Sequence, residues 1–307
     1  MATTKVATPT KIDISSLRGT LESLKGADDL LITDKEVDPH LELAGLSKHF
    51  DGGSAMLFEK VKGYPNGRLV TNVFACEERV SRLFGVRIEV RGRPVAGSGV
   101  LIAANHASWL DITVLSAVIP VSFVAKSEVA RWPFFGTLAR LQRTVFVERE
   151  RRAKTHEHSN EIAARVAKGD AIILFPEGTS GDGNRVLKFN SSLFGAAEAE
   201  SGAPEIPVQP LSVAYTKLHG LPMGREFRPF FAWYGAMEMA SHLWNAILMG
   251  PIDVVLEFHE PLTISRCGSR KELARQAERL VSEGVARALT GRPPAPRVKD
   301  QPAMAAS

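Results

Sequence analysis

The sequence predicts an α/β fold, in which a central sheet is flanked by helices over residues 86–290 and preceded by a small N-terminal extension. Two observations support this prediction. Segments of strand character and helix character alternate from Val86 onward. The segments at residues 100–104 and 171–175 are continuously apolar, as strands are when both faces of a sheet are covered.

Each expected element rests on a local pattern. Residues 86–90 alternate as an exposed strand does, and Gly169 marks the end of a helix. Ser269 and Glu272 form a capping box that opens a helix running to about Leu289. The other expected elements are buried strands at 97–104, 171–175 and 206–215, further strands at 121–125 and 252–258, and helices at 112–118 and 154–168.

The chain divides into four parts by composition. Residues 1–28 are polar and irregular, which predicts a mobile start. Residues 29–85 carry short apolar patches between turn signals, so a small α+β element with a thin core is expected there. The main domain follows at 86–290, and residues 291–307, rich in Pro and Ala, predict a disordered tail.

Composition excludes several protein classes. The 307 residues contain only two cysteines, which rules out a small secreted disulfide scaffold. The 44% hydrophobic content rules out wholesale disorder. The first 16 residues contain no apolar stretch typical of a signal peptide, and no uncharged apolar run reaches the ~20 residues that span a bilayer. We therefore expect a soluble, cytoplasmic protein.

The net charge of +4 is unevenly distributed. Residues 1–85 hold 11 basic and 12 acidic residues, whereas residues 126–170 hold 10 basic and 6 acidic ones. The positive surplus therefore lies in the middle of the chain. It indicates either an anionic partner or a solvated charged helix face, and the charge alone does not decide between them.

The motif most suggestive of chemistry follows the buried strand at 97–104. There Asn105 and His106 are followed, five residues after the histidine, by Asp111. The two side chains can meet if His106 lies in the turn before a helix and Asp111 in its first turns. An aspartate that accepts from one imidazole nitrogen leaves the other nitrogen as a general base. A bare pattern of this kind is more often structural, with the aspartate favoured at a helix start.

Two further motifs favour the catalytic interpretation. Phe175-Pro176-Glu177-Gly178-Thr179-Ser180 also stands where a buried strand meets a loop. Functional residues of α/β sheets gather beyond the carboxyl ends of the strands, so this loop and the one at His106 can face one cleft. Between them lies a basic stretch containing Phe146 and Arg149, and arginines at a strand end suit bidentate binding of phosphate or carboxylate.

Together and in this order, these residues resemble the glycerolphosphate and lysophospholipid acyltransferase family. Its blocks are Asn-His-x4-Asp, a Phe and Arg near a strand end, Phe-Pro-Glu-Gly-Thr, and an apolar strand with prolines, here at Ile206 to Pro210. The resemblance covers about residues 86–262. It implies an acyltransferase-type central sheet and transfer of a fatty acyl group from acyl-ACP or acyl-CoA to the hydroxyl of a lysolipid of the 1-acyl-glycerol-3-phosphate type.

The resemblance also implies roles for individual residues. His106 would take the proton of the acceptor hydroxyl, and Asp111 would orient His106. The expected substrate-binding residues are Asn105, Phe146, Arg149, Glu177, Gly178, Thr179 and Arg185.

The chain departs from the family pattern at one position. The third block commonly continues with an arginine that helps to hold the acceptor phosphate, whereas Ser180 follows Thr179 here. Arg185 or Lys188 is a possible substitute. This variant is similar to bacterial members that acylate lyso-ornithine lipid, which is therefore the alternative acceptor.

We expect peripheral contact with an anionic membrane on the inner face of the cell membrane, because the substrates are lipids and the surplus charge is basic. The aromatic and Met residues between Trp233 and Val255 more often form core than a membrane anchor. No cofactor is expected. Zinc binding is not expected either, because His156 and His158 lack a third ligand at suitable spacing. The basic residues also lack the aromatic platform of a nucleic-acid binder.

Residues 29–85 resemble something else, the beginning of UbiD-type decarboxylases, through the stretches Val37 to Leu43, Ala55 to Pro65 and Asn72 to Val80. Nothing after Gly85 continues that pattern, so we interpret this part as a fragment without the decarboxylase chemistry. Two alternatives of other classes follow: a non-catalytic lipid- or acyl-carrier-binding protein, and a decarboxylase-related flavin module. The intact His106/Asp111 pair argues against the first, and the missing decarboxylase sequence against the second.

Overall fold

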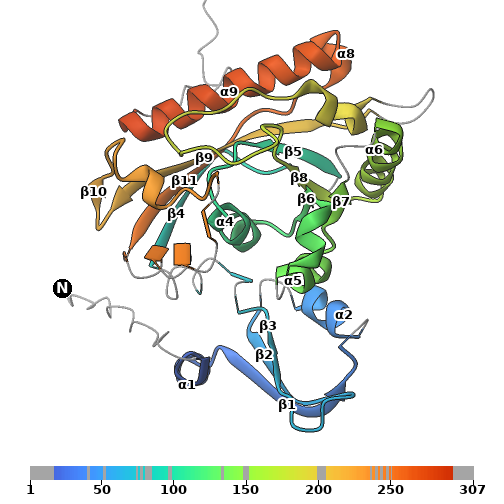
Figure 1. Cartoon of the computed structure of the whole chain (residues 1–307), viewed down its shortest axis with the longest axis vertical. Helices are drawn as coiled ribbons and strands as arrows, with labels where there is room; N and C mark the ends of the chain where they lie inside the picture. Colours follow the sequence, from blue (N-terminus) through green and yellow to red (C-terminus); the bar gives the residue numbers. More distant parts are fainter. Residues whose placement is uncertain are drawn as a thin grey trace, which may run out of the picture.

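Figure 1 shows the computed structural model of the chain. The structure describes residues 17–39, 42–50, 53–73, 75–76, 79, 85–95, 99–132, 135–147, 152–198, 205–235, 237–238, 241–242, 245–246, 249 and 251–292. Two sheets organise these residues, one of three strands and one of eight.

The eight-stranded sheet has the order β4-β11-β9-β5-β8-β6-β7, with β10 paired to β9 outside that path. Five neighbouring strands, from β9 through β7, are parallel to one another, whereas β11 runs antiparallel to β9. The strands are β4 (Val86–Arg91), β5 (Val100–Ala104), β6 (Ser122–Lys126), β7 (Val145–Val147), β8 (Ala171–Leu174), β9 (Val208–Leu218), β10 (Leu221–Pro222) and β11 (Ile252–Phe258).

Helices cover both faces of this sheet, as the sequence predicted (Figure 1). On one face the core joins Ile102 of β5 and Val213 of β9 to Leu115 of α4 (Leu110–Val118). On the other face Leu101 packs with residues of α6 (Arg152–Ala167) and α9 (Arg270–Thr290). Since β5 is buried along its whole length, its apolar run is explained by cover on both sides.

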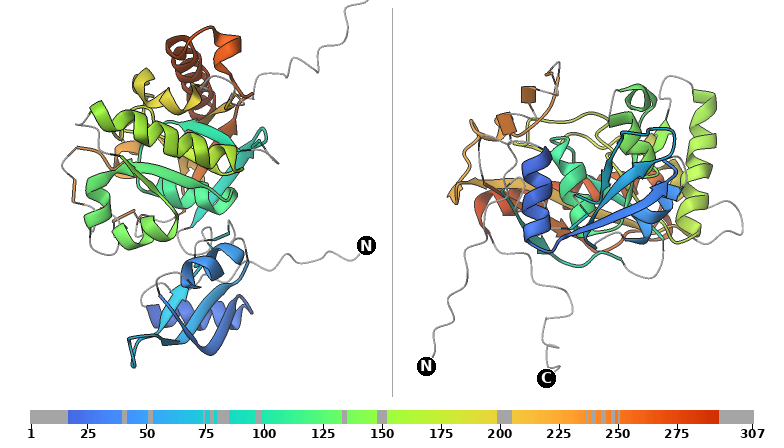
Figure 2. Two further views of the ribbon diagram at one scale, coloured as in Figure 1. Left: turned by 90° about the vertical axis from the view of Figure 1, so that its right-hand side faces the viewer. Right: turned by 90° about the horizontal axis from the view of Figure 1, so that it is seen from below.

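The N-terminal part folds separately around a small sheet of order β1-β2-β3 (Figure 2). Val37, Leu43 and Phe58 belong to its compact apolar cluster, which is much smaller than either cluster of the main sheet. Its elements are α1 (Leu17–Gly26), β1 (Leu30–Val37), α2 (Glu42–His49), β2 (Ala55–Val61) and β3 (Leu69–Thr71).

The structure places a helix in the N-terminal segment, residues 1–28, that we expected to be irregular. Residues 17–26 form α1, where Leu24 is fully buried against Ala55, and this contact anchors the helix. Residues 1–16 lie outside the described part of the chain, as does most of the expected tail, residues 293–307.

The strand at 252–258 and the helix opened by Ser269 were predicted correctly, and the Ser269 hydroxyl accepts from the Glu272 N–H at 3.2 Å. The Glu272 carboxylate does not complete the capping box but binds Arg275 and Gln276. The described helices of the main domain that the sequence did not predict are short: η1 (Ser127–Arg131), α5 (Phe135–Leu141), η2 (Ser191–Ala197), η3 (Arg228–Phe230) and α8 (Ile264–Cys267). None of the described helices combines the length and apolar composition that crossing a membrane requires.

Candidate active site

The structure brings His106 and Asp111 together at the carboxyl end of β5. His106 lies in the loop of residues 105–109, which we call the β5–α4 loop, and Asp111 lies in the first turn of α4. The His106 Nδ1 is 2.8 Å from the Asp111 Oδ2. The sequence predicted this geometry, a histidine before the helix and an aspartate at its start, because five residues on one continuous helix would have separated them.

Asp111 is fully buried and accepts four hydrogen bonds. Its Oδ2 receives the His106 imidazole and the backbone N–H groups of Ala107 and Ser108, at 2.8, 2.8 and 3.0 Å. Its Oδ1 receives the Tyr215 hydroxyl at 2.6 Å. These donors compensate the desolvation of the carboxylate, which is expensive to bury alone. Burial, with the Asp111 charge as a second cause, raises the pKa of Tyr215 well above its usual value, so its hydroxyl remains a donor.

This arrangement selects the tautomer of His106. Because the Asp111 carboxylate only accepts, Nδ1 must carry the proton and Nε2 keeps its lone pair. The His106 side chain is 19% exposed, whereas that of Asp111 is 0% exposed. The pair therefore presents a base to the outside and a buried anion behind it, which is the geometry that general-base catalysis requires.

Backbone hydrogen bonds hold the β5–α4 loop in place. The carbonyl of His106 accepts from the Gly181 N–H, and that of Ala107 accepts from the Trp233 N–H, both at 2.8 Å. The Ser180 hydroxyl donates to the Trp233 carbonyl and so links the two supporting segments. The hydrogen bonds from Gly181 and Trp233 hold the backbone of the loop and so fix the position of the His106 imidazole.

Phe175, at the end of β8, stacks on the imidazole of His106. The ring centroids are 4.1 Å apart and the planes differ by 19°. Phe123 stacks in turn on Phe175, at 6.2 Å. A π face against the imidazole limits its rotation, and it also stabilises the ring when the imidazole becomes a cation.

Glu177 binds backbone rather than facing open solvent. Its Oε2 accepts from the N–H of His106 at 3.0 Å, and its Oε1 accepts from the N–H of Leu187 at 2.7 Å. Burial raises the pKa of Glu177 to about 8, and the two backbone donors offset only part of that effect. Glu177 thus connects the β5–α4 loop to the loop of residues 175–190, which we call the β8–η2 loop.

Asn105 has contacts typical of a positioning residue. Its Nδ2 donates to the Val213 carbonyl at 2.9 Å, and its Oδ1 accepts from the Val213 N–H at 2.8 Å. The side chain thereby extends the pairing of β5 with β9 by one step, and the residue is 5% exposed. We expected Asn105 to contact the substrate. In the structure its side-chain amide forms hydrogen bonds with the backbone of the neighbouring strand β9.

The other expected binding residues are distributed differently. Gly178 adopts a φ of 75°, which favours glycine, and Thr179 and Arg185 are exposed on the β8–η2 loop. Phe146 lies in the edge strand β7, three strands from β5 and hence roughly 14 Å away at ordinary strand spacing. The structure does not bring it next to His106. Arg149 lies outside the described residues.

A polar network joins the β8–η2 loop to the segment after β10. Asn184 donates from its backbone to Asp182 and accepts from the buried guanidinium of Arg228 at 2.8 Å. Arg228 also donates to the Met223 carbonyl at 2.9 Å. A Cβ built on Gly183 would lie 3.7 Å from the Cβ of Arg228 and 3.9 Å from that of Ala107, so Gly183 lies close to both Arg228 and the β5–α4 loop.

Tyr215 and Phe175 are the site residues that sequence reasoning did not single out. Tyr215 is the last of eight consecutive buried residues of β9, and a buried tyrosine hydroxyl needs a hydrogen-bond partner. That signal predicts a polar neighbour but does not identify Asp111. Phe175 belonged to the second motif, but nothing in the sequence placed its ring on His106.

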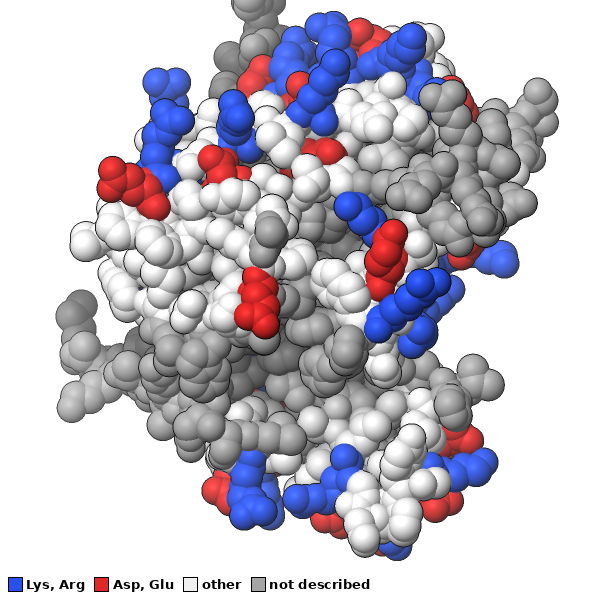
Figure 3. Space-filling view, viewed as in Figure 1, with Lys and Arg blue, Asp and Glu red and all other residues white. Residues whose placement is uncertain are grey.

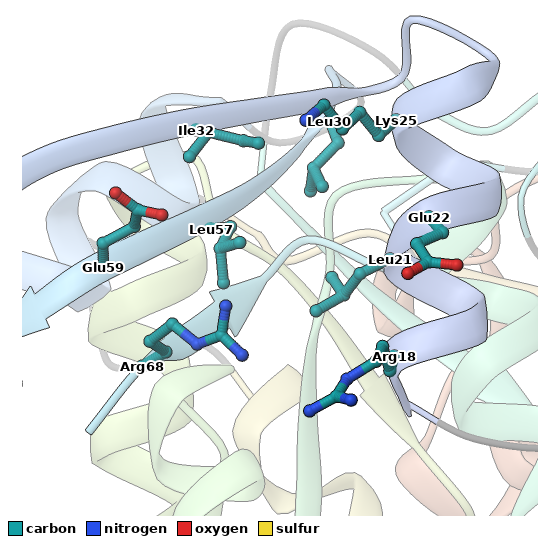
Figure 4. A pocket seen from close by; sticks show the side chains of 9 residues that line it. All are labelled: Arg18, Leu21, Glu22, Lys25, Leu30, Ile32, Leu57, Glu59 and Arg68. Atoms are coloured by element: carbon teal, nitrogen blue, oxygen red, sulfur yellow. The ribbon is translucent and has the colours of Figure 1, made fainter. Parts of the chain in front are cut away.

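The described residues form two open hollows whose lining does not include His106. One, of about 480 Å³, lies in the N-terminal part between α1 and the sheet face that presents Leu30, Ile32 and Leu57 (Figure 4). Its rim is mixed in charge and consists of Arg18, Glu22, Lys25, Glu59 and Arg68. The other, of about 550 Å³, lies beside η3 in the main domain.

Comparisons with known proteins divide the chain in the same way. Residues 87–214 match the Acyltransferase family, and residues 21–93 match the 3-octaprenyl-4-hydroxybenzoate carboxy-lyase N-terminal domain. The chain is 50% identical over 241 residues to the lyso-ornithine lipid O-acyltransferase of Brucella abortus, covering 77% of this chain and 88% of that protein. It is 44% identical to the protein of the same name from Rhizobium meliloti, covering 73% and 78%.

Similarity to other acyltransferases is lower. The 1-acyl-sn-glycerol-3-phosphate acyltransferase of Neisseria gonorrhoeae is 33% identical over 168 residues, covering 55% of this chain and 62% of that protein. The crystal structure of the 1-acyl-sn-glycerophosphate acyltransferase of Thermotoga maritima is similar with a TM-score of 0.49 and 28% identity, covering 71% of this chain and 78% of that one.

Proposed function

The chain belongs to the acyltransferase family, and on that premise we propose that it transfers a fatty acyl group to the hydroxyl of lyso-ornithine lipid. The observation that carries this proposal is the 50% identity to a lyso-ornithine lipid O-acyltransferase over 88% of that protein. The relative named for 1-acyl-sn-glycerol-3-phosphate shares only 33% identity over a shorter stretch.

The sequence of the β8–η2 loop supports lyso-ornithine lipid as the acceptor. Ser180 follows Thr179, where members that bind an acceptor phosphate commonly carry an arginine. In the structure the Ser180 hydroxyl donates to the Trp233 carbonyl, so it supports the fold of the site. Arg185 and Lys188 are exposed basic residues of this loop, and we assign Arg185, five residues after Ser180, to the acceptor head group.

The mechanism that we propose uses the His106–Asp111 pair directly. The Nε2 of His106 takes the proton of the acceptor hydroxyl as the oxygen attacks the thioester carbonyl of the donor. Asp111 stabilises the imidazolium that results, and Phe175 covers one face of it. Collapse of the tetrahedral intermediate forms the ester and releases the donor thiolate, which recovers the proton from His106.

The proposal includes the acyl donor and the location of the protein in the cell. The donor is acyl-ACP or acyl-CoA, since both supply the thioester that the reaction consumes. The protein works in peripheral contact with an anionic membrane on the inner face of the cell membrane, where a lysolipid acceptor is available.

An acyl-transfer assay tests the proposal by offering lyso-ornithine lipid and 1-acylglycerol-3-phosphate in parallel, with both donors. We expect faster acylation of lyso-ornithine lipid. Faster acylation of 1-acylglycerol-3-phosphate would replace the proposed acceptor by that lipid, and failure to acylate either would favour a non-catalytic lipid-binding protein.

A further inference from the structure

An exposed apolar surface lies on the segment that follows β10. Phe227 is 50% exposed, Phe230 is 53% exposed and Met237 is 38% exposed, which is unusual for such large apolar side chains. The two phenylalanine rings lie 6.2 Å apart, and Phe230 and Met237 line one hollow. We call these three residues the apolar surface.

Aromatic side chains with a polar end adjoin this surface. Trp233 packs edge-on against Trp132 at 5.9 Å, and its indole N–H donates to the Met237 carbonyl at 2.9 Å. Tyr234 follows in the chain and is partly exposed. Tryptophan and tyrosine beside exposed phenylalanine are typical of proteins that lie at a membrane–water interface.

The segment carries few exposed charges. Arg228 is buried, and Lys217 pairs with Asp253 at 3.8 Å. Arg225, Glu226 and Glu238 are exposed, so the described residues form no like-charged surface beside the hollow. Figure 3 shows that few charged side chains interrupt the molecular surface on the side that carries β10.

The apolar surface adjoins the β5–α4 loop. The hollow lined by Phe230 and Met237 also includes His242, whose Nδ1 accepts from the Trp109 indole at 3.0 Å. Trp109 stands two residues before Asp111, at the N-cap of α4. On the other side, the Trp233 N–H binds the Ala107 carbonyl. A lipid held at this surface is therefore close to the β5–α4 loop.

We propose that Phe227, Phe230 and Met237 dock the protein on a lipid bilayer and so present the acceptor to His106, an inference that rests on the proposed lysolipid function. Exposed apolar patches mark interaction surfaces, and the interfacial aromatic residues, the scarcity of exposed charge and the position beside the β5–α4 loop, where a lysolipid must react, point to lipid as the partner.

Vesicle co-sedimentation tests the proposal with the full chain and the Phe227→Ser/Phe230→Ser double variant. The vesicles contain phosphatidylcholine with a minor fraction of phosphatidylglycerol. We expect the partition coefficient of the double variant to fall about tenfold or more. The matched control is Leu31→Ser/Ile32→Ser, which removes two similarly exposed apolar side chains from β1 in the N-terminal part and leaves partitioning unchanged.

Three further measurements make the outcome decisive. Thermal unfolding shows whether the variants fold, and Phe227→Trp/Phe230→Trp should retain vesicle binding because tryptophan also suits the interface. The ratio of the acylation rate with acceptor in vesicles to that with dissolved acceptor should fall in the serine variant. Sedimentation velocity shows whether the surface instead joins two copies of the chain.

Unchanged vesicle binding by the serine variant would overturn the proposal. So would a wild-type dimer that the serine substitutions dissociate while vesicle binding persists. Failure of the proposed acceptor is recognised separately, because vesicle binding would still depend on Phe227 and Phe230 while no ornithine lipid is formed.

Discussion

The β5–α4 loop and the β8–η2 loop meet at one edge of the sheet, and each involves a carboxylate that binds backbone N–H groups. Asp111 is fully buried, and two of its four donors are side chains. Glu177 is half-buried, its hydrogen-bond partners within the described part of the chain are backbone N–H groups, and burial raises its pKa to about 8. In the proposed mechanism Asp111 acts through His106, whereas the contacts of Glu177 hold the two loops together.

Replacing His106 gives the largest expected effect. His106→Ala should lower kcat by about 10²–10⁴-fold, the usual contribution of a general base, with little change in KM. Steady-state acyl transfer to lyso-ornithine lipid measures the change. If the His106→Ala variant folds and transfers acyl groups at the wild-type rate, the β5–α4 loop does not supply the general base and the proposed mechanism is wrong.

Tyr215→Phe should have the next largest effect, because it removes one of the four donors to a buried carboxylate. We expect the free energy of unfolding to fall by about 1.5–3 kcal/mol, as for other hydrogen bonds to charged groups. Denaturant unfolding measures the loss, and Tyr64→Phe, at a residue that is 62% exposed, is the control. Equal stability of the two variants would mean that Asp111 does not need this donor.

Glu177→Gln should show its effect in the pH dependence of stability. Since the pKa of Glu177 is raised from 4.5 to about 8 in the fold, its contribution to stability is present below pH 4.5 and is lost as the pH rises toward 8. A glutamine does not titrate. The free energy of unfolding of wild type relative to the variant should therefore fall with rising pH, by up to about 1.4 kcal/mol per pH unit. Chemical denaturation at several pH values measures this difference in the free energy of unfolding. A difference that stayed constant with pH would contradict the prediction.

Arg185→Ala should have the smallest effect, confined to acceptor binding. Loss of one exposed charge contact should raise the KM for lyso-ornithine lipid about two- to tenfold and leave kcat nearly unchanged. Arg266→Ala, which removes an exposed charge from α8, is the control. A large loss of kcat in Arg185→Ala would place this loop in the chemistry as well.

The sequence was sufficient for the parts of the fold that local patterns determine. The continuous apolar runs of β5 and β8 indicated strands buried on both faces, and the polar residues just beyond them indicated the site. The proximity of His106 and Asp111 was also predictable, because it depends on a short loop and the first turn of one helix.

Contacts between distant strands could not be predicted in the same way. The Tyr215 hydroxyl reaches Asp111 because β9 lies next to β5, and a single sequence does not reveal that strand order. The backbone partners of Glu177 depend likewise on how two loops fold over each other. The helix that carries Leu24 was missed although Leu17, Leu21 and Leu24 recur at i, i+4 and i+7, because this single short helical repeat stands among polar residues.

The most direct test of the account is a double-mutant cycle between His106 and Asp111. The single-turnover rate of acyl transfer to lyso-ornithine lipid is measured for wild type, Asp111→Asn, His106→Ala and the double variant, after each is shown to be folded. If Asp111 acts through His106, Asp111→Asn lowers the rate of wild type but causes no further loss in His106→Ala. An equal loss in both backgrounds would show that the two residues act independently and would contradict the proposed general-base pair.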